Sequence, residues 1–139
     1  MKRSIHIEAP VEKVFAFVKD PRNVPEGFTE HMEVRDVKLT DEGTGSYYSW
    51  VFHVAGLPVE GFDVYTEFIP NQRITDRSSF PMTRDFITTF EPEGSGMKLT
   101  VETGHGSFWR FPPFRQLADL GQTMMFDRFM PALKAQMEG

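Results

Sequence analysis

The first twenty-one residues constrain the fold of this chain more than any other segment. Residues 4–8 alternate polar and apolar side chains, which is typical of a half-buried strand. Ala9-Pro10 ends that strand, because proline cannot donate to a strand ladder and suits the first turn of a helix. Four apolar residues then recur at helical spacing: Val11, Val14, Phe15 and Val18. Asp20-Pro21 ends the run, so the sequence predicts a strand that leads directly into a short helix.

The rest of the chain predicts an antiparallel sheet followed by one long helix. Six further segments have strand composition and turn residues between them: 32–39, 46–54, 62–69, 73–80, 84–90 and 97–103. The apolar residues of the first of these segments do not share one parity, so we expect a bulge there. Pro25 and Gly27, which precede it, allow a second short helix or a turn. From Phe114 to Met137 an apolar stripe at three- and four-residue steps predicts a helix, which Pro131 should kink or divide.

The opening pattern and three later stretches, residues 45–74, 90–99 and 133–138, resemble one family. The chain is similar in them to the START / polyketide cyclase-like superfamily (SRPBCC), the helix-grip proteins that include the birch-pollen-allergen relatives. This resemblance implies a single domain over residues 1–139 with an α+β helix-grip fold. A strongly curved antiparallel sheet of six to seven strands would wrap around the long C-terminal helix, with two short helices after the first strand. Such a fold often leaves a cavity between sheet and helix.

Composition excludes several classes of function. The chain has 139 residues and no cysteine, so a disulfide framework, a thiol nucleophile and a cysteine-bound metal are all excluded. The net charge of −5 disfavours nucleic acid as a partner, because that affinity depends on clustered Lys and Arg. The four histidines do not stand at metal-ligand spacing, and we expect no metal and no cofactor. With no long apolar run, we expect no membrane span and a cytoplasmic location.

Strand parity predicts which side chains face the concave side of the sheet. The apolar or aromatic inward positions are Tyr48, Trp50, Phe52, Val64, Phe68, Ile74, Phe80, Phe86, Phe90, Leu99 and Val101. The polar inward positions are Thr66, Asp76, Ser78, Arg84, Thr88, Thr103 and His105. Asp63, Tyr65 and Glu67 are expected to face outward. The predicted ligand-binding residues are Tyr48, Trp50, Phe52, Asp76, Phe80, Arg84, Phe86, Thr88, His105, Met124 and Met125.

Two inward charges on neighbouring strands invite an Asp76–Arg84 pair, because an unpaired buried charge is costly. Arg84 would then anchor a ligand carboxylate or phenolate, with His105 as a titratable neighbour. Alternatively, Arg84 lies at a strand end and reaches solvent, and His105 lies in a loop. Met124 and Met125 could line an adaptable pocket floor or pack as ordinary core.

We expect the chain to bind a small, largely apolar ligand, aromatic, polyketide-like or lipid-like, because its concave face is aromatic with few polar groups. The alternative is an enzyme of the polyketide cyclase or dehydratase type, with Tyr48, Asp76, Arg84 and His105 as acid–base candidates. No catalytic residue can be assigned from a motif. A third reading is a partner-binding module, with Tyr47, Val51 and Tyr65 as an outward apolar patch that could equally serve a homodimer.

Overall fold

The computed structural model describes residues 1–29, 32–54, 56–78, 84–104 and 114–139, with side chains throughout these ranges except at 54, 114–122 and 124. The elements are β1 (Lys2–Ile7), α1 (Val11–Val18), β2 (Met32–Lys38), β3 (Tyr47–Val54), β4 (Leu57–Ile69), β5 (Arg73–Ser78), β6 (Arg84–Glu93), β7 (Gly96–Thr103) and α2 (Phe114–Glu138). Neither helix of this described part combines the length and the apolar character that crossing a bilayer requires.

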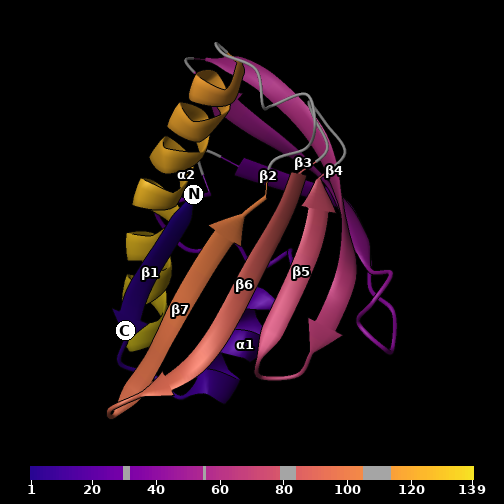
Figure 1. Ribbon diagram of the computed structural model, residues 1–139. Coiled ribbons are helices and arrows are strands. Elements are labelled where there is room, and N and C mark those ends of the chain that lie inside the picture. The colour runs from indigo at the N-terminus through magenta and orange to yellow at the C-terminus, as the bar shows by residue number, and fades with distance from the viewer. Residues whose placement is uncertain (30–31, 55, 79–83, 105–113) are drawn as a thin grey trace.

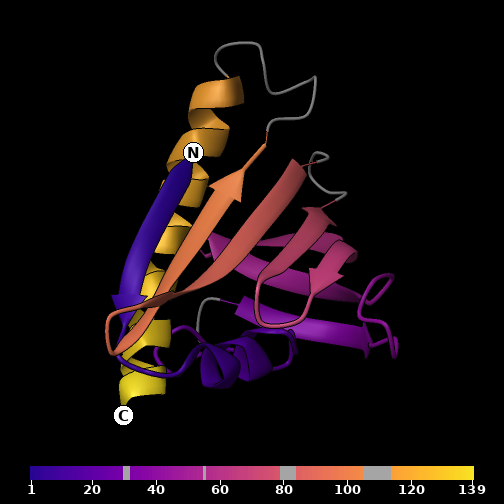
Figure 2. The same ribbon diagram turned by 60° about the horizontal axis from the view of Figure 1, so that its bottom comes forward.

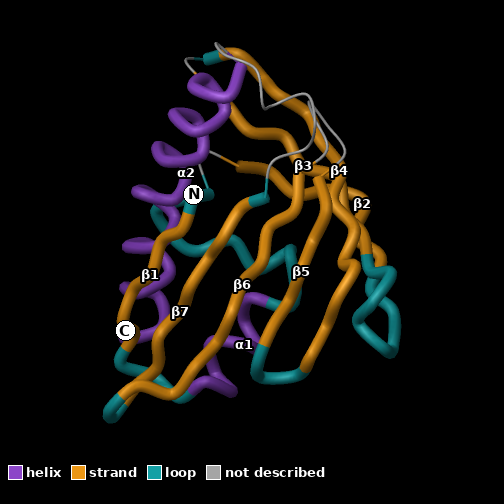
Figure 3. Tube along the Cα trace, viewed as in Figure 1, coloured by secondary structure: helices purple, strands orange, loops and turns teal. Residues whose placement is uncertain are grey.

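The seven strands form one antiparallel sheet in the order β1-β7-β6-β5-β4-β3-β2. The sheet is strongly curved, and α2 runs along the β1 side of it (Figure 1). The tube trace shows the consecutive hairpins from β2 to β7 and the short helix α1 near the turns that join β4 to β5 and β6 to β7 (Figure 3). The α+β helix-grip fold predicted from the sequence is therefore confirmed.

Both helices pack their apolar residues against the concave face. In α1 the buried residues are Val11, Val14 and Phe15, and the Phe15 ring meets Phe68 and Phe90 edge-on at centroid distances of 5.3 and 5.0 Å. Among the described side chains of α2, the buried ones are Phe126, Met130, Leu133 and Met137. Viewed from below, α1 closes the end of the sheet near the C-terminus, while β2 to β4 curve away from α2 (Figure 2). The core thus lies at the α1 end and beneath β1, β7 and β6.

Three local expectations meet different outcomes. The expected bulge in β2 is confirmed by a register shift between Arg35 and Lys38, with Asp36 at φ 51°. After α1 the chain makes turns instead of the second short helix; Gly27 has φ 84°, a conformation that glycine adopts without strain. The long helix is not divided at Pro131, which lies inside a continuous α2.

The facing predicted for the first half of β4 is wrong. Tyr65 and Asp63 are 5% and 4% exposed and lie on the inner face, whereas Thr66 is exposed. A second bulge, between Tyr65 and Glu67, explains the error, because one extra residue reverses the alternation. Phe68 follows the bulge and faces the core, as predicted.

Candidate functional site

A line of polar side chains crosses the concave face. The strand register places Tyr48 of β3 opposite Asp63 of β4, Asp63 opposite Ser78 of β5, and Ser78 opposite Arg84 of β6. Directly opposite residues of a sheet share one face, with Cβ atoms about 5 Å apart. Asp63, Ser78 and Arg84 are only 4%, 5% and 4% exposed. This polar line concentrates the buried polar groups of β4 to β6 at one level of the sheet.

The side chain of Trp50 contacts this line of polar residues at Asp63. Its indole Nε1 donates a hydrogen bond to Asp63 Oδ1 at 2.6 Å. The ring can lie there because its strand neighbour is Gly61: a Cβ at that position would come within 2.1 Å of Trp50 Cζ2. Glycine at residue 61 therefore leaves the space in which the indole reaches the carboxylate.

Asp76 and Asp63 are diagonal neighbours on the adjacent strands β5 and β4. Asp76 lies one level along the sheet, opposite Tyr65 and Phe86. Burial, followed by the hydrogen bond to Asp63 and the charge of that group, raises the pKa of the Asp76 carboxyl well above its ordinary value. A like charge so close to a buried carboxyl favours the protonated form of Asp76.

The tyrosines beside this pair stay neutral. Burial, then the charges of Asp63 and Asp76, raise the pKa of the Tyr48 phenol. Burial and the charge of Asp76 raise the pKa of the Tyr65 phenol in the same way, and its hydroxyl donates to the Lys19 carbonyl at 3.0 Å. The Tyr48 and Tyr65 rings meet edge-on at 6.4 Å. The neutral rings of Tyr48 and Tyr65 therefore lie beside the two carboxyl groups.

The structure brings most of the predicted site residues to the same face. The partly buried residues among them are Tyr48, Trp50, Phe52, Asp76, Phe86 and Thr88. Phe86 meets Phe126 of α2 with ring centroids 6.2 Å apart, and Phe52 meets Phe28 at the same distance. Met125 packs partly buried against the core. Phe80, His105 and the Met124 side chain lie outside the described residues.

Among the contacts of the described residues, Asp76 and Arg84 are not paired with each other. Asp76 lies beside Asp63, while Arg84 Nε donates to the Gly104 carbonyl at 3.3 Å. Arg84 is buried, so it does not reach solvent from a strand end either.

Asp63 and Tyr65 are the members of the site that the sequence prediction missed. Parity was carried through β4 without a bulge, which placed both side chains outside. The signal was present in two large aromatics three residues apart, Tyr65 and Phe68. Both can face the core only if one extra residue interrupts the alternation between them.

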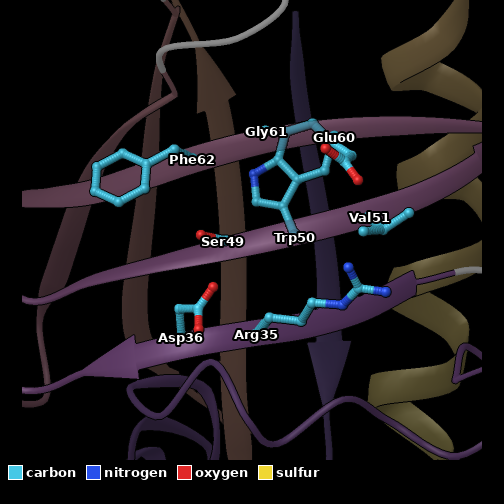
Figure 4. A pocket seen from close by; sticks show the side chains of 8 residues that line it. All are labelled: Arg35, Asp36, Ser49, Trp50, Val51, Glu60, Gly61 and Phe62. Carbon is cyan, nitrogen blue, oxygen red and sulfur yellow. The ribbon is translucent and has the colours of Figure 1, made fainter.

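The outward patch expected for a partner or a second copy loses two of its three members, because Val51 and Tyr65 are buried. Instead, the large exposed apolar residues are Leu39, Leu57 and Phe62. A shallow depression of about 400 Å³ lies across β2, β3 and β4, with Phe62 and Ser49 on one side and Arg35 and Glu60 on the other (Figure 4). Trp50, whose indole donates to Asp63, also borders this depression.

Metal binding has no support in the described side chains, which contain no group of three or more histidines and carboxylates close enough to hold an ion.

The family described as "Polyketide cyclase / dehydrase and lipid transport" matches residues 1–138. Protein CV1439 from Chromobacterium violaceum has a similar fold, with a TM-score of 0.73 at 22% identity, covering 100% of this chain and 97% of its own. Ms6760 from Mycobacterium smegmatis has a similar fold with a TM-score of 0.77 at 18% sequence identity, and the match covers 96% of this chain and 87% of Ms6760. Ara h 8.0201 has a similar fold with a TM-score of 0.68 at 15% sequence identity, and the match covers 97% of this chain and 94% of Ara h 8.0201. No curated protein matches the chain.

Proposed function

Because the chain belongs to the polyketide cyclase / dehydrase and lipid transport family, we propose that it binds a small, largely apolar ligand on the concave face of its sheet. Aromatic, polyketide-like and lipid-like molecules are the classes that fit. The aromatic side chains of β3 and β6 would contact the apolar body of the ligand, and the Asp63–Asp76 pair would contact a polar group. The protein would bind this molecule without any metal or cofactor.

The observation that carries the proposal is the incomplete burial of residues that lie deep in the fold. Tyr48 and Asp76 lie on the inner face of central strands, yet each residue as a whole is only partly buried. Phe86, on the neighbouring strand, is also only partly buried. A deep residue that is not fully covered borders an internal space, and an aromatic space with few polar groups is the usual form of a small-molecule site.

Fluorescence of Trp50 offers a direct test. The Trp109→Phe variant leaves Trp50 as the single indole, in contact with Asp63 at the site. Titration with naphthalene derivatives and medium-chain fatty acids should change its emission saturably, and native mass spectrometry should show one ligand per chain. If no compound of either class changed the emission or appeared as a complex, the proposal would be wrong.

A matched pair of variants distinguishes ligand binding on the concave face from binding on the outer face. Phe86→Ala removes a ring on the inner face, and we expect a loss of affinity of about tenfold or more, since a buried ligand contact of this size contributes over 1 kcal/mol. Phe62→Ala removes a ring that is 38% exposed on the outer face and should leave affinity unchanged. Equal effects of the two variants would place the ligand elsewhere.

The Asp63–Asp76 pair also favours a second candidate, an enzyme of the cyclase or dehydratase type. A partly buried carboxyl with a raised pKa is suited to general acid catalysis on a carbonyl or hydroxyl group. Asp76→Asn should then lower kcat by 10²-fold or more, roughly the contribution of a general acid, while substrate still binds. Unchanged turnover in that variant would exclude Asp76 as the general acid, whereas no turnover of any cyclase or dehydratase substrate by the wild type would leave binding as the function.

A further inference from the structure

Strand β2 forms one edge of the sheet, and β3 is its single neighbour in the strand order. Among the described residues, no backbone hydrogen bond joins Met32–Lys38 to a segment other than β3. The exposed residues of this strand are Glu33, Arg35, Asp36 and Lys38. An edge strand presents unpaired N–H and C=O groups to which the strand of another chain can add.

The opposite edge of the sheet, β1, is already covered. Helix α2 runs beside it (Figure 1), and Lys134 Nζ donates to the His6 carbonyl at 2.7 Å. Just beyond the strand, the amide of Glu8 donates to the Glu138 carboxylate at 2.8 Å. Within the part of the chain that the structure describes, β2 is therefore the edge at which the sheet can be extended.

Glu33 and Arg35 carry opposite charges on the outer face of β2. Arg35 Nε donates to Glu33 Oε1 at 2.9 Å, and Arg35 Nη2 donates to Glu33 Oε2 at 3.1 Å. Their side chains are 56% and 51% exposed, so both remain accessible to a further charged partner. Val34, between them, lies opposite Trp50 and faces the inner side. The edge thus carries one charge of each sign on either side of a central valine.

This arrangement is self-complementary when two copies of β2 pair antiparallel. A two-fold axis perpendicular to the sheet keeps the outer side chains on the outer side, so each residue must face one of its own parity. An axis at Val34 sets Glu33 of each copy opposite Arg35 of the other. An axis at Glu33 or at Arg35 would set like charges directly opposite each other, which is destabilising. The charges therefore select one register.

We propose that two copies of this chain associate by antiparallel pairing of β2 about an axis at Val34. The bulge after Arg35 ends the ladder, so the paired segment is short. A contact of this size lies well below a standard interface, and we expect a dissociation constant of about 10–100 µM. The pairing goes beyond the proposed ligand binding and does not depend on it, because the axis leaves both concave faces uncovered on the same side of the joined sheet.

Sedimentation equilibrium of the full chain measures the association from about 5 µM to about 500 µM, a range that brackets the expected dissociation constant. The wild type should dimerise. Glu33→Arg and Arg35→Glu, each alone, should weaken the dimer by about tenfold or more, because both cross-strand pairs then carry like charges. A wild type that stays monomeric throughout this range would overturn the proposal.

An equimolar mixture of these two variants gives the sharpest test. One variant carries two positive charges at the edge and the other carries two negative charges, so together they should form a heterodimer as tight as the wild-type dimer. The matched control is the outer-face pair of Arg77 and Asp85, which lies on central strands at 2.8 Å. Arg77→Glu and Asp85→Arg should each dimerise as the wild type does. Association that persists in both β2 variants, or a mixture that restores none, would overturn the β2 interface.

A single introduced thiol tests the register, because the chain has no cysteine. In the proposed pair the two Val34 side chains face each other with Cβ atoms about 5 Å apart, so Val34→Cys should give a disulfide-linked dimer on mild oxidation. Thr66→Cys, exposed on β4 away from the edge, should not. Equal cross-linking at the two positions would overturn the proposed register.

Discussion

Gly61 is the residue whose replacement reports most directly on the geometry of the carboxyl pair. In Gly61→Ala the new Cβ would overlap the Trp50 ring, at 2.1 Å from Cζ2, so the indole must move away from Asp63. We expect a loss of stability of about 1–3 kcal/mol, the usual cost of overpacking. Urea unfolding measures this loss, and the fluorescence of Trp50 reports the displaced ring. In a Trp50→Phe background, which lacks Cζ2, the same substitution should cost much less; an equal cost would contradict the assigned contact.

The contacts of His6 predict that the stability of the folded protein depends on pH. The His6 Nε2 hydrogen-bonds to Glu8, and its Nδ1 bonds to Glu93 Oε1 at 2.6 Å. These hydrogen bonds, to Glu8 first and Glu93 second, raise the pKa of the imidazole. A raised pKa means that the folded state holds the proton more tightly, so the stabilisation is complete below the ordinary value of 6.5 and is lost as pH rises through the folded pKa. The melting temperature of the wild type should therefore fall across that interval relative to His6→Gln, and parallel profiles would contradict the prediction.

At the scale of elements, the sequence predicted every strand and both helices, but strand facing only where the alternation is continuous. In β3 and β6 the inward positions are as expected, from Tyr48 and Trp50 to Arg84 and Phe86. The β2 bulge was predictable because its apolar residues break parity. The β4 bulge was missed because Val64 and Phe68 are both apolar and fit an uninterrupted strand, and the spacing of Tyr65 and Phe68 was the one sign against it. Because of that extra residue, the prediction placed Asp63 on the outer face instead of beside Asp76.

Helix α2 packs on the core through Leu133, which is fully buried. Leu133→Ala should destabilise the protein by about 2–5 kcal/mol, because it removes apolar contacts and leaves a cavity. The matched control is Leu57→Ala, in β4: this side chain is 69% exposed, and its loss should stay within about 0.5 kcal/mol. Urea denaturation of the two variants gives the comparison. A small effect at Leu133 would mean that α2 is not packed as described.

For the whole molecule, one core joins segments from both ends of the chain. It contains Ile7 of β1, Phe15 of α1, Leu99 of β7 and Leu133 of α2. Between the ends of α2 and β1, Lys134 Nζ donates to the His6 carbonyl at 2.7 Å, and Glu138 accepts from the Glu8 amide at 2.8 Å. With its terminal elements sharing one buried cluster, the chain should unfold as a single cooperative domain.

Thermal unfolding followed by two probes checks this prediction. Far-ultraviolet circular dichroism reports all elements, whereas Trp50 fluorescence in Trp109→Phe reports β3 and the carboxyl pair. The two curves should coincide, because β3 and β4 depend on the same core through Tyr48 and Tyr65, which pack on it. Leu133→Ala should lower both midpoints equally, although the substitution lies in α2. A Trp50 transition that kept its wild-type midpoint in that variant would show that β2 to β4 fold independently of the helix, and the candidate site would then not need α2 to form.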